Sequence, residues 1–385
     1  MSTAAFTPFF KVASRAFSHS SSSSSSARRF VLSGSVAAVL TTAAWAYENK
    51  KKSQGNYNGN KPNGLLSKAF LGGLFASKEY DNNTREASLD VKPFEYYQKV
   101  YNDIALKIRE HDEWDDGSYG PILVRFAWHN SGSYSQHDHT QTKGGSYSGT
   151  MRFEKEQHDP ENAGLPGAEK FLKSIKDKYP DLSTGDLNTL GGVVGIQEMQ
   201  GPKIPWRPGR KDLGPEAIPP YHRLPDASQT SSGYVRSVFN DRLGFSDEEM
   251  VALIGVGHSI GRCHTTSSGY DGPWTFSPTI VTNEFFKLLL NEDWDWKKWN
   301  GKKQYEDVKT KSLMALPTDM TLKTDPRFKK YSEIFAKDND RCMSVFASAF
   351  SRLLERGVSF PSSTKPMTFQ TLDEQHIGED DDDEE

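Results

Sequence analysis

Cysteine is scarce in this chain of 385 residues, since only Cys263 and Cys342 occur. A framework of disulfides is therefore not expected to hold the fold together. Runs of alternating polar and apolar residues are also scarce, and no internal repeat is evident, so we expect a mainly α protein with little or no sheet. The length allows two domains or lobes with a large core between them.

Acidic residues are absent from residues 1–47, which instead contain three arginines and a run of serines. This composition is typical of a mitochondrial presequence. An apolar segment of 18 residues, 30–47, precedes a group of three lysines and has the minimum length for a membrane span. We expect residues 1–64 to be a presequence, a hydrophobic sorting segment and a linker, with release into the mitochondrial intermembrane space. An inner-membrane anchor facing that space, or a matrix location, is the alternative.

Charge is unevenly divided along the chain. Residues 1–52 hold seven basic residues and one acidic residue, so the remainder has 40 basic and 50 acidic residues and a net charge of −10. Such an acidic surface suits a basic partner and argues against nucleic acid as a partner. Residues 110–116 and the tail of residues 373–385 are rich in acids, and each indicates either a solvated segment or a surface that attracts a basic partner.

One helix is predicted to end at an imidazole. Ser246 and Glu249 have the spacing of a capping box, and the apolar run of residues 250–256 indicates burial on nearly all sides. His258 follows, and Gly261 marks the expected end of the helix. A buried histidine there has two interpretations: a core ring bonded to a backbone carbonyl, or a ligand of a metal or of haem iron.

A second helix is predicted over residues 121–131, with Pro121 in its first turn. Arg125, Trp128 and His129 are spaced so that their side chains point to one side of it. Three such residues in an otherwise apolar helix would be costly to bury unless they serve a polar cavity or a ligand. Together they offer a base and a fixed positive charge, which cleavage of a peroxide O–O bond requires.

The polar turn of residues 156–165 offers a partner for His129. Asn162 in isolation indicates ordinary turn chemistry. If its side chain reached the His129 ring, it would fix the tautomer and leave the other ring nitrogen free to accept a proton. Glu156 is a candidate to hold Asn162 in place.

Six segments of the chain resemble the intracellular haem peroxidases, and most of all the mitochondrial cytochrome c peroxidases of fungi. They are LVRFAWH (123–129), DPENAGL (159–165), GGVVGIQEMQGPKIPWRPGR (191–210), GHSIGRCH (257–264), SGYDGPW (268–274) and LPTD (316–319). The resemblance runs from about residue 93 to about residue 372. It implies a mainly α, two-lobed haem peroxidase fold with one non-covalently bound haem b between the lobes. The distal lobe is expected over residues 88–228 with a C-terminal helix at about 344–372, and the proximal lobe over residues 229–343. Within that C-terminal part, the last helix is expected around residues 344–355.

The resemblance also implies roles on the two sides of the haem. On the proximal side, His258 would be the axial ligand of the haem iron, and Asp319 would accept a hydrogen bond from its other ring nitrogen, which raises the basicity of the ligand. Trp274 would lie beside His258, bond to Asp319 and hold one oxidising equivalent as a radical cation. Three further residues would contact the haem propionates: Arg262, His264 and Ser268.

On the distal side, the resemblance implies that His129 takes a proton from hydrogen peroxide and delivers it to the leaving oxygen. Arg125 would stabilise the developing negative charge and then the ferryl oxygen. Trp128 would pack over the haem and bond to bound water or oxygen, and Asn162 would orient His129. The complete distal set favours turnover over a haem-based peroxide sensor, because sensing alone would not need a full acid–base pair.

The expected reductant follows from the positions at which this chain differs from the relatives that use ascorbate. In relatives that use ascorbate, an arginine, a lysine and a cation-binding aspartate take the positions of Ser267, Tyr119 and Thr282. The resemblance therefore implies that the chain reduces hydrogen peroxide with electrons from ferrous cytochrome c. The stretches GRCH and GPWT are similar to the ascorbate users, so ascorbate or mixed specificity stays open. A monomer is expected, with no nucleic-acid partner and with membrane contact only through the N-terminal sorting segment.

Overall fold

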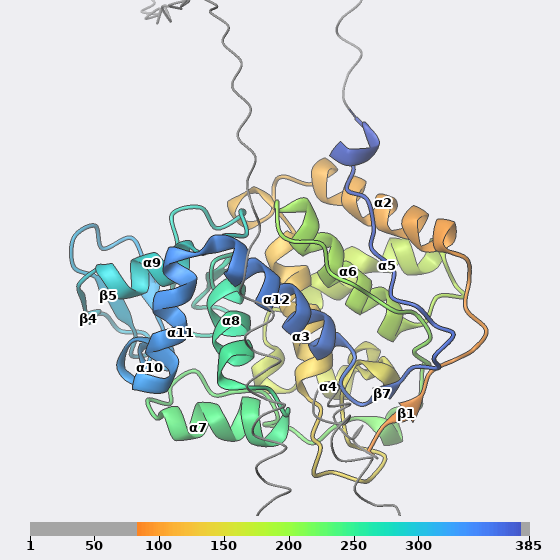
Figure 1. The fold of residues 1–385 in the computed structure, drawn as a ribbon, viewed down its shortest axis with the longest axis horizontal. Helices are drawn as coiled ribbons and strands as arrows, with labels where there is room; N and C mark the ends of the chain where they lie inside the picture. Colours follow the sequence, from red (N-terminus) through yellow and green to blue (C-terminus); the bar gives the residue numbers. More distant parts are fainter. Residues whose placement is uncertain (1–82, 379–385) are drawn as a thin grey trace, which may run out of the picture. The chain divides into compact units, whose positions relative to one another are not determined.

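Residues 83–378 are described by a computed structural model, and they form a mainly α fold, as the sequence predicts (Figure 1). The helices are α2 (Phe94–Glu110), α3 (Gly120–Gly132), α4 (Glu154–Gln157), α5 (Pro166–Lys178), α6 (Thr184–Glu198), α7 (Ser232–Arg236), α8 (Asp247–Gly257), α9 (Glu284–Asn291), α10 (Met320–Thr324), α11 (Pro326–Lys337) and α12 (Asn339–Leu354). A π-helix, Ser237–Arg242, continues α7.

The strands in the described part of the chain are two or three residues long and pair into three small sheets. They are β1 (Arg85–Glu86) with β7 (Val358–Ser359), β2 (Arg262–Cys263) with β3 (Gly272–Pro273), and β4 (Trp294–Trp296), β5 (Tyr305–Asp307) and β6 (Met314–Ala315) in that order. The β1–β7 pair is parallel and the other pairs are antiparallel. The prediction of little or no sheet is therefore confirmed for these residues.

Several predictions concern parts of the chain outside the described residues. The presequence, the apolar segment 30–47 and the linker precede residue 83, and the last seven residues of the acidic tail follow residue 378. Within residues 83–378, no helix has the length and apolar composition that crossing a membrane would need. These residues all belong to one compact unit, and their division into a distal and a proximal lobe stays a prediction.

Glycines in α6 let it lie close against α3, the helix that carries the predicted distal residues. A Cβ at Gly192 would lie 2.3 Å from the Cβ of Ala127. A Cβ at Gly195 would lie 2.8 Å from the carbonyl oxygen of Gly120. Larger side chains at either position would push the two helices apart. Because α6 is buried along almost its whole length, this close contact fixes α3 against the main hydrophobic core.

The helix predicted to lead to His258 is α8. The Ser246 side chain accepts a hydrogen bond from the amide of Glu249 at 3.3 Å, and the Glu249 carboxylate accepts one from the amide of Ser246 at 2.8 Å, so the predicted capping box is confirmed. The helix ends at Gly257, ahead of Gly261, whose φ of 70° turns the chain. Helix α12 crosses α8 and also contacts α3, so the two helices with predicted site residues share a neighbour (Figure 1).

The last helix ends close to residue 355, as the narrower prediction has it, and does not extend to residue 372. It spans Asn339–Leu354 as α12, because Gly357, with a φ of 78°, and then Pro361 interrupt the helical backbone. The two residues of β7 follow and pair with β1. Residues 358–372 are therefore extended and irregular rather than helical.

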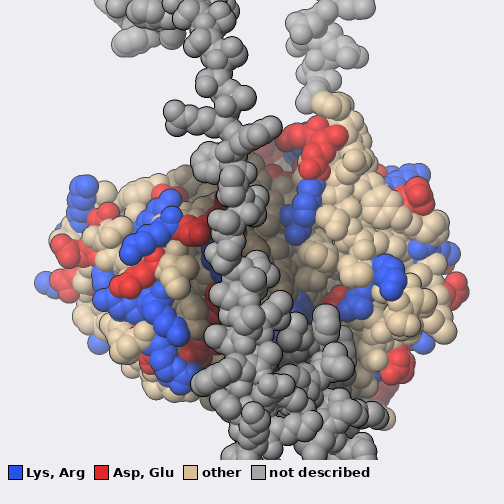
Figure 2. Space-filling view, in the orientation of Figure 1, with Lys and Arg blue, Asp and Glu red and all other residues tan. Residues whose placement is uncertain are grey.

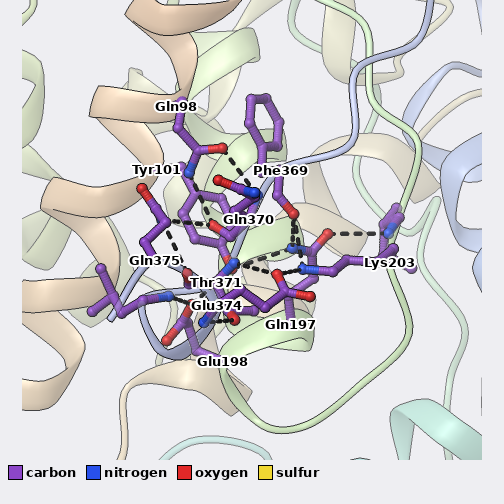
Figure 3. Close-up of polar contacts among 12 residues, drawn as sticks. Gln98, Tyr101, Gln197, Glu198, Lys203, Phe369, Gln370, Thr371, Glu374 and Gln375 are labelled. Atoms are coloured by element: carbon purple, nitrogen blue, oxygen red, sulfur yellow. Dashed lines mark hydrogen bonds and ion pairs between the residues drawn. The ribbon is translucent and has the colours of Figure 1, made fainter. Parts of the chain in front are cut away.

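The segment after β7 returns to helices α2 and α6 (Figure 3). Gln197 of α6 donates to the carbonyl oxygen of Phe369 at 3.2 Å. The neighbouring Glu198 carboxylate accepts hydrogen bonds from the Tyr101 hydroxyl at 2.8 Å and from the amide of Leu372 at 3.2 Å. These contacts attach the end of the described chain to the first long helix and to the helix that supports α3.

Candidate active site

A fully buried carboxylate organises the side chains that follow α8. Oδ1 of Asp319 lies 2.9 Å from Nδ1 of His258. Its Oδ2 accepts hydrogen bonds from Nε1 of Trp274 at 2.9 Å and from the amide of Leu316 at 2.8 Å. Because an ionised carboxylate only accepts hydrogen bonds, Nδ1 of His258 carries the hydrogen and Nε2 keeps its lone pair. The structure thus brings together the three residues predicted for the proximal side.

The His258 ring lies against two aromatic rings. Trp274 stacks on it with ring centroids 4.4 Å apart and an interplanar angle of 13°, and Phe285 meets it edge-on at 5.9 Å. Among the described residues, Nε2 of His258 has no hydrogen-bond partner. A Cβ at the preceding Gly257 would meet no atom within 4 Å. A carboxylate and not a backbone carbonyl holds this ring, and its second nitrogen is available to a metal.

On α3, the nearly buried His129 is held by the turn that contains Asn162. Nδ1 of His129 lies 2.9 Å from Oδ1 of Asn162, and Nδ2 of Asn162 donates to the carbonyl oxygen of Glu156 at 2.8 Å. These contacts assign the hydrogen to Nδ1 of His129 and leave Nε2 with a lone pair that can accept a proton. Glu156 holds Asn162 through its backbone oxygen and not through its carboxyl group.

The same turn holds Arg125. The guanidinium donates to the carbonyl oxygens of Ala163 at 3.0 Å and Glu161 at 3.1 Å. Burial lowers the pKa of Arg125 to about 10, so the side chain stays charged at neutral pH. Trp128 stacks on Phe239 with ring centroids 5.5 Å apart. A single turn therefore positions both the imidazole and the positive charge that α3 presents.

The surroundings of His129 keep its ring neutral. Burial, followed by the charge of Arg125, lowers the pKa of His129 well below its ordinary value, although the hydrogen bond with Asn162 acts in the opposite direction. The neutral imidazole is the form that accepts a proton from a substrate. At neutral pH the site therefore combines a competent base with a fixed positive charge.

Close backbone approaches bring the segment after α8 against the distal helix. A Cβ at Gly261 would lie 2.9 Å from the Cβ of Pro121 at the start of α3. A Cβ at Gly164 would lie 2.7 Å from Oγ of Ser267 and 3.8 Å from Nη1 of Arg125. Glycine is needed at position 164 because its φ is 86° and because no side chain fits there.

The residues predicted to contact haem propionates have polar partners within the chain. Nε of Arg262 donates to Oδ2 of Asp116 at 2.6 Å, and Nε2 of His264 lies 3.1 Å from Oδ1 of Asp115. Ser268 donates to the carbonyl oxygen of His264 at 3.4 Å. Part of the acidic run before α3 thus pairs with this segment instead of remaining available to a partner. The propionate contacts stay a prediction.

Some contributors to the site have no pattern in the sequence that identifies them. The amide of Leu316, which shares Asp319, is a backbone group, so its residue type carries no information about this contact. Phe239 lies in the π-helix after α7, and Phe285 lies in the first turn of α9. Both are ordinary apolar core residues by composition, and only the fold places them against Trp128 and His258.

Comparisons with known proteins agree with this geometry. The profile of the peroxidase family matches residues 100–338. The mitochondrial cytochrome c peroxidase of Yarrowia lipolytica is 57% identical over 274 residues, which cover 71% of this chain and 79% of the relative. The protein of the same name from Pyricularia oryzae is 52% identical over 302 residues, with 78% and 81% covered. The resemblance predicted from the six motifs is confirmed, and this chain belongs to the peroxidase family.

Proposed function

We propose that this chain is an enzyme that reduces hydrogen peroxide to water with electrons from ferrous cytochrome c. Relatives that are 52% to 57% identical over most of the chain carry the name cytochrome c peroxidase. The observation that carries the proposal is a pair of imidazoles, His129 and His258, each held through Nδ1 with its Nε2 unbonded among the described residues. One such nitrogen suits iron, and the other suits the proton of a peroxide.

The peroxidase family implies haem. We propose that it is one non-covalently bound haem b. Nε2 of His258 has no hydrogen-bond partner among the described residues, and no Cys-x-x-Cys-His stretch offers covalent attachment. When bound, haem supplies an iron centre that binds peroxide and is oxidised by it. His258 would hold the iron, and the bond from its Nδ1 to Asp319 would raise its basicity. The proposed propionate partners are Arg262, His264 and Ser268.

The distal residues handle the protons of the reaction. Nε2 of His129 takes the proton from one peroxide oxygen and delivers it to the other, so that the O–O bond breaks with water as the leaving group. Arg125 stabilises the negative charge that develops on the departing oxygen. One hydrogen peroxide takes up two electrons and two protons in total and yields two water molecules.

Trp274 carries electrons on the proximal side. Its Nε1 donates to Asp319, so the negative charge of the carboxylate lowers the cost of a positive charge on the indole. Ferrous cytochrome c returns an electron to the oxidised ring, and two cytochromes are oxidised for each peroxide. Thr282, at the position where ascorbate users bind a cation, accepts a hydrogen bond from the amide of Glu284 at 3.2 Å. A cation there would raise the cost of oxidising the indole.

The alternative reductant is ascorbate, which is an anion. Tyr119, at the position of the lysine in the ascorbate users, stacks on Trp114 and Phe171 with ring centroids 4.7 Å and 4.3 Å apart. Neither this ring nor the hydroxyl of Ser267 offers the positive charge that would bind an anion. We therefore expect cytochrome c to be the faster reductant.

Steady-state turnover of the haem-loaded chain, with ferrous cytochrome c and with ascorbate in parallel, tests this proposal. Fast oxidation of cytochrome c with slow oxidation of ascorbate would support it. Comparable rates would show a peroxidase of mixed specificity. Failure with both reductants, despite a normal haem spectrum, would overturn the proposal in favour of a haem-based peroxide sensor.

Acid is expected to act on His129 in two measurable ways. The rate of the reaction with peroxide, followed by stopped flow, should be constant near neutral pH and fall as the pH drops toward the lowered pKa of His129. The free energy of unfolding should also fall below a pH of about 6.5, because the unfolded chain then binds a proton that the folded chain does not. A His129→Leu variant should lose this part of the pH dependence, and an unchanged dependence would contradict the assignment.

We infer that the enzyme acts as a monomer in the intermembrane space, where the N-terminal segments predicted from the sequence would deliver it. The relatives are named mitochondrial, which supports the organelle and does not distinguish between its compartments. The alternatives are an inner-membrane anchor that faces the same space, and the matrix. Protease accessibility in intact mitochondria and in mitochondria with a ruptured outer membrane separates the two compartments, and carbonate extraction separates a released protein from an anchored one.

The acidic tail is expected to steer a lysine-rich cytochrome. Lys and Arg side chains gather over α11 in Figure 2. Because like charges repel, this part of the surface is not expected to attract the cytochrome, and an acidic segment would have to do so. Deletion of residues 379–385, an unbroken acidic run, should lower the association rate at low salt and leave it unchanged at an ionic strength of about 0.15 M, where the Debye length is about 8 Å. The measurement is stopped flow at both salt concentrations, and equal rates for the two chains at low salt would end this idea.

A further inference from the structure

A second group of metal-binding side chains lies outside the haem site. Asp159, Glu161 and His222 each offer one ligand atom, and these atoms all lie within 4.8 Å of one another. Nδ1 of His222 lies 2.8 Å from Oε1 of Glu161. The proposed haem chemistry uses none of these three side chains.

One buried carboxyl oxygen of this cluster lacks a hydrogen-bond donor among the described residues. Asp159 is only 7% exposed, and Oε2 of Glu161 is buried with no hydrogen-bond partner among the described residues. Burial raises the pKa of Glu161, and the adjacent Asp159 acts in the same direction while His222 opposes it. Two carboxyl groups that share a partly buried site need a proton or a cation between them. His222 pairs with Oε1 of Glu161, and Oε2 of the same carboxyl group still lacks a partner, which a bound cation would supply.

The cluster is assembled by two segments that are fixed separately. The turn with Asp159 and Glu161 is the one that holds Arg125 on its inner side. His222 is anchored through its neighbours, since the Tyr221 hydroxyl donates to the carbonyl oxygen of Lys155 at 2.5 Å and Arg223 donates to that of Ser133 at 3.1 Å. The side chain of His222 is 73% exposed, so an ion can enter from solvent.

We propose that Asp159, Glu161 and His222 bind a divalent transition-metal ion of the zinc type, with water completing the coordination. One imidazole nitrogen and two carboxylate oxygens form a ligand set that Zn²⁺ accepts, whereas Mg²⁺ and Ca²⁺ prefer oxygen ligands alone. The ion would replace the hydrogen between His222 and Glu161 and would give the unpaired Oε2 a partner. Binding would release protons from the ligands.

A metal ion at this site would help to position Arg125 and His129 without contacting either side chain. The backbone oxygen of Glu161 accepts from Arg125, and the next residue, Asn162, orients His129. A metal ion on the Glu161 carboxylate would therefore stiffen the turn that positions both groups. This role is one of positioning, because the ligands themselves contact neither peroxide nor haem.

Isothermal titration of the haem-loaded chain with Zn²⁺ alone tests the site. Haem is present so that His258 is not free to bind the added metal. The wild-type chain should bind one Zn²⁺ at this site, and His222→Gln should weaken that binding at least tenfold. The matched control is His137→Gln, because the exposed His137 pairs with one carboxylate, Asp241 at 3.3 Å, but belongs to no such three-residue group. The control should bind Zn²⁺ as the wild type does.

Thermal unfolding gives an independent readout. Saturating Zn²⁺ should raise the Tm of the wild type and of His137→Gln, and should raise it less in His222→Gln, because an ion that binds only the folded state stabilises it. Without Zn²⁺, the three chains should have the same Tm, which shows that the variants fold. Absence of saturable binding, or equal affinity in wild type and His222→Gln, would overturn the proposal whether or not the haem site turns over.

Discussion

Replacing Trp274 by phenylalanine is expected to lower the rate of cytochrome c oxidation about 1,000-fold and to leave the oxidation of small molecules largely intact. The indole donates to the buried Asp319 carboxylate. At a separation of about 4 Å and an effective dielectric constant of about 20, this charge stabilises an oxidised ring by about 4 kcal/mol. That energy corresponds to about three orders of magnitude in rate. Phenylalanine has no N–H for Asp319, and its ring is harder to oxidise.

The measurement is steady-state peroxide turnover with ferrous cytochrome c and, separately, with a small phenol. Trp128 offers a matched control, because it is an indole of the same site that stacks on Phe239 and has no carboxylate partner among the described residues. Trp128→Phe should retain most of its cytochrome c oxidation. Equal loss with both reductants in Trp274→Phe would defeat the claim that this ring relays electrons.

Replacing His129 by leucine is expected to slow the reaction with hydrogen peroxide about 10,000-fold, the upper range for the loss of a general acid–base. Leucine is apolar and similar in size to histidine, so the buried position stays filled. However, no group near the peroxide then accepts its proton. Stopped-flow spectroscopy of the haem-loaded variant, mixed with peroxide, gives the bimolecular rate constant directly. A normal haem spectrum before mixing would show that the proximal side is intact.

The effect of His129 can be separated from that of its support. Asn162→Ala keeps the imidazole but removes the oxygen that holds its Nδ1, so a smaller fall of about 10- to 100-fold is expected, as for other residues that orient a functional histidine. Similar rates for His129→Leu and the wild-type chain would show that another group handles the proton, and the proposed mechanism would then be wrong.

The helices that carry the site could be predicted because their patterns are local. The spacing of Ser246 and Glu249 encodes the cap of α8, and Pro121 marks the first turn of α3. The path of the chain after the last helix could not be predicted as well. Residues 358–359 leave the helical pattern to pair with residues 85–86, which are far away in the sequence, and such a long-range contact has no local pattern.

The candidate site was predictable only in part from residue spacing. Spacing places Arg125 and His129 on one side of a helix, but it does not say what they face. The contact of His258 with Asp319 spans 61 positions in the sequence, so a family resemblance and not periodicity indicated it. The pairing of Arg262 with Asp116 was not foreseen, because an acidic run reads as solvated by composition alone.

The carboxylate of Asp319 has a consequence for how variants of the proximal side combine. Its Oδ2 serves both Trp274 and the amide of Leu316, while Oδ1 serves His258. Removing the indole leaves Oδ2 with one donor and concentrates more negative charge toward the imidazole. Changes at these positions are therefore energetically coupled, and their effects should not add. A double-mutant cycle over Trp274 and Asp319 would measure how strongly the proposed electron carrier is coupled to the carboxylate that also holds His258.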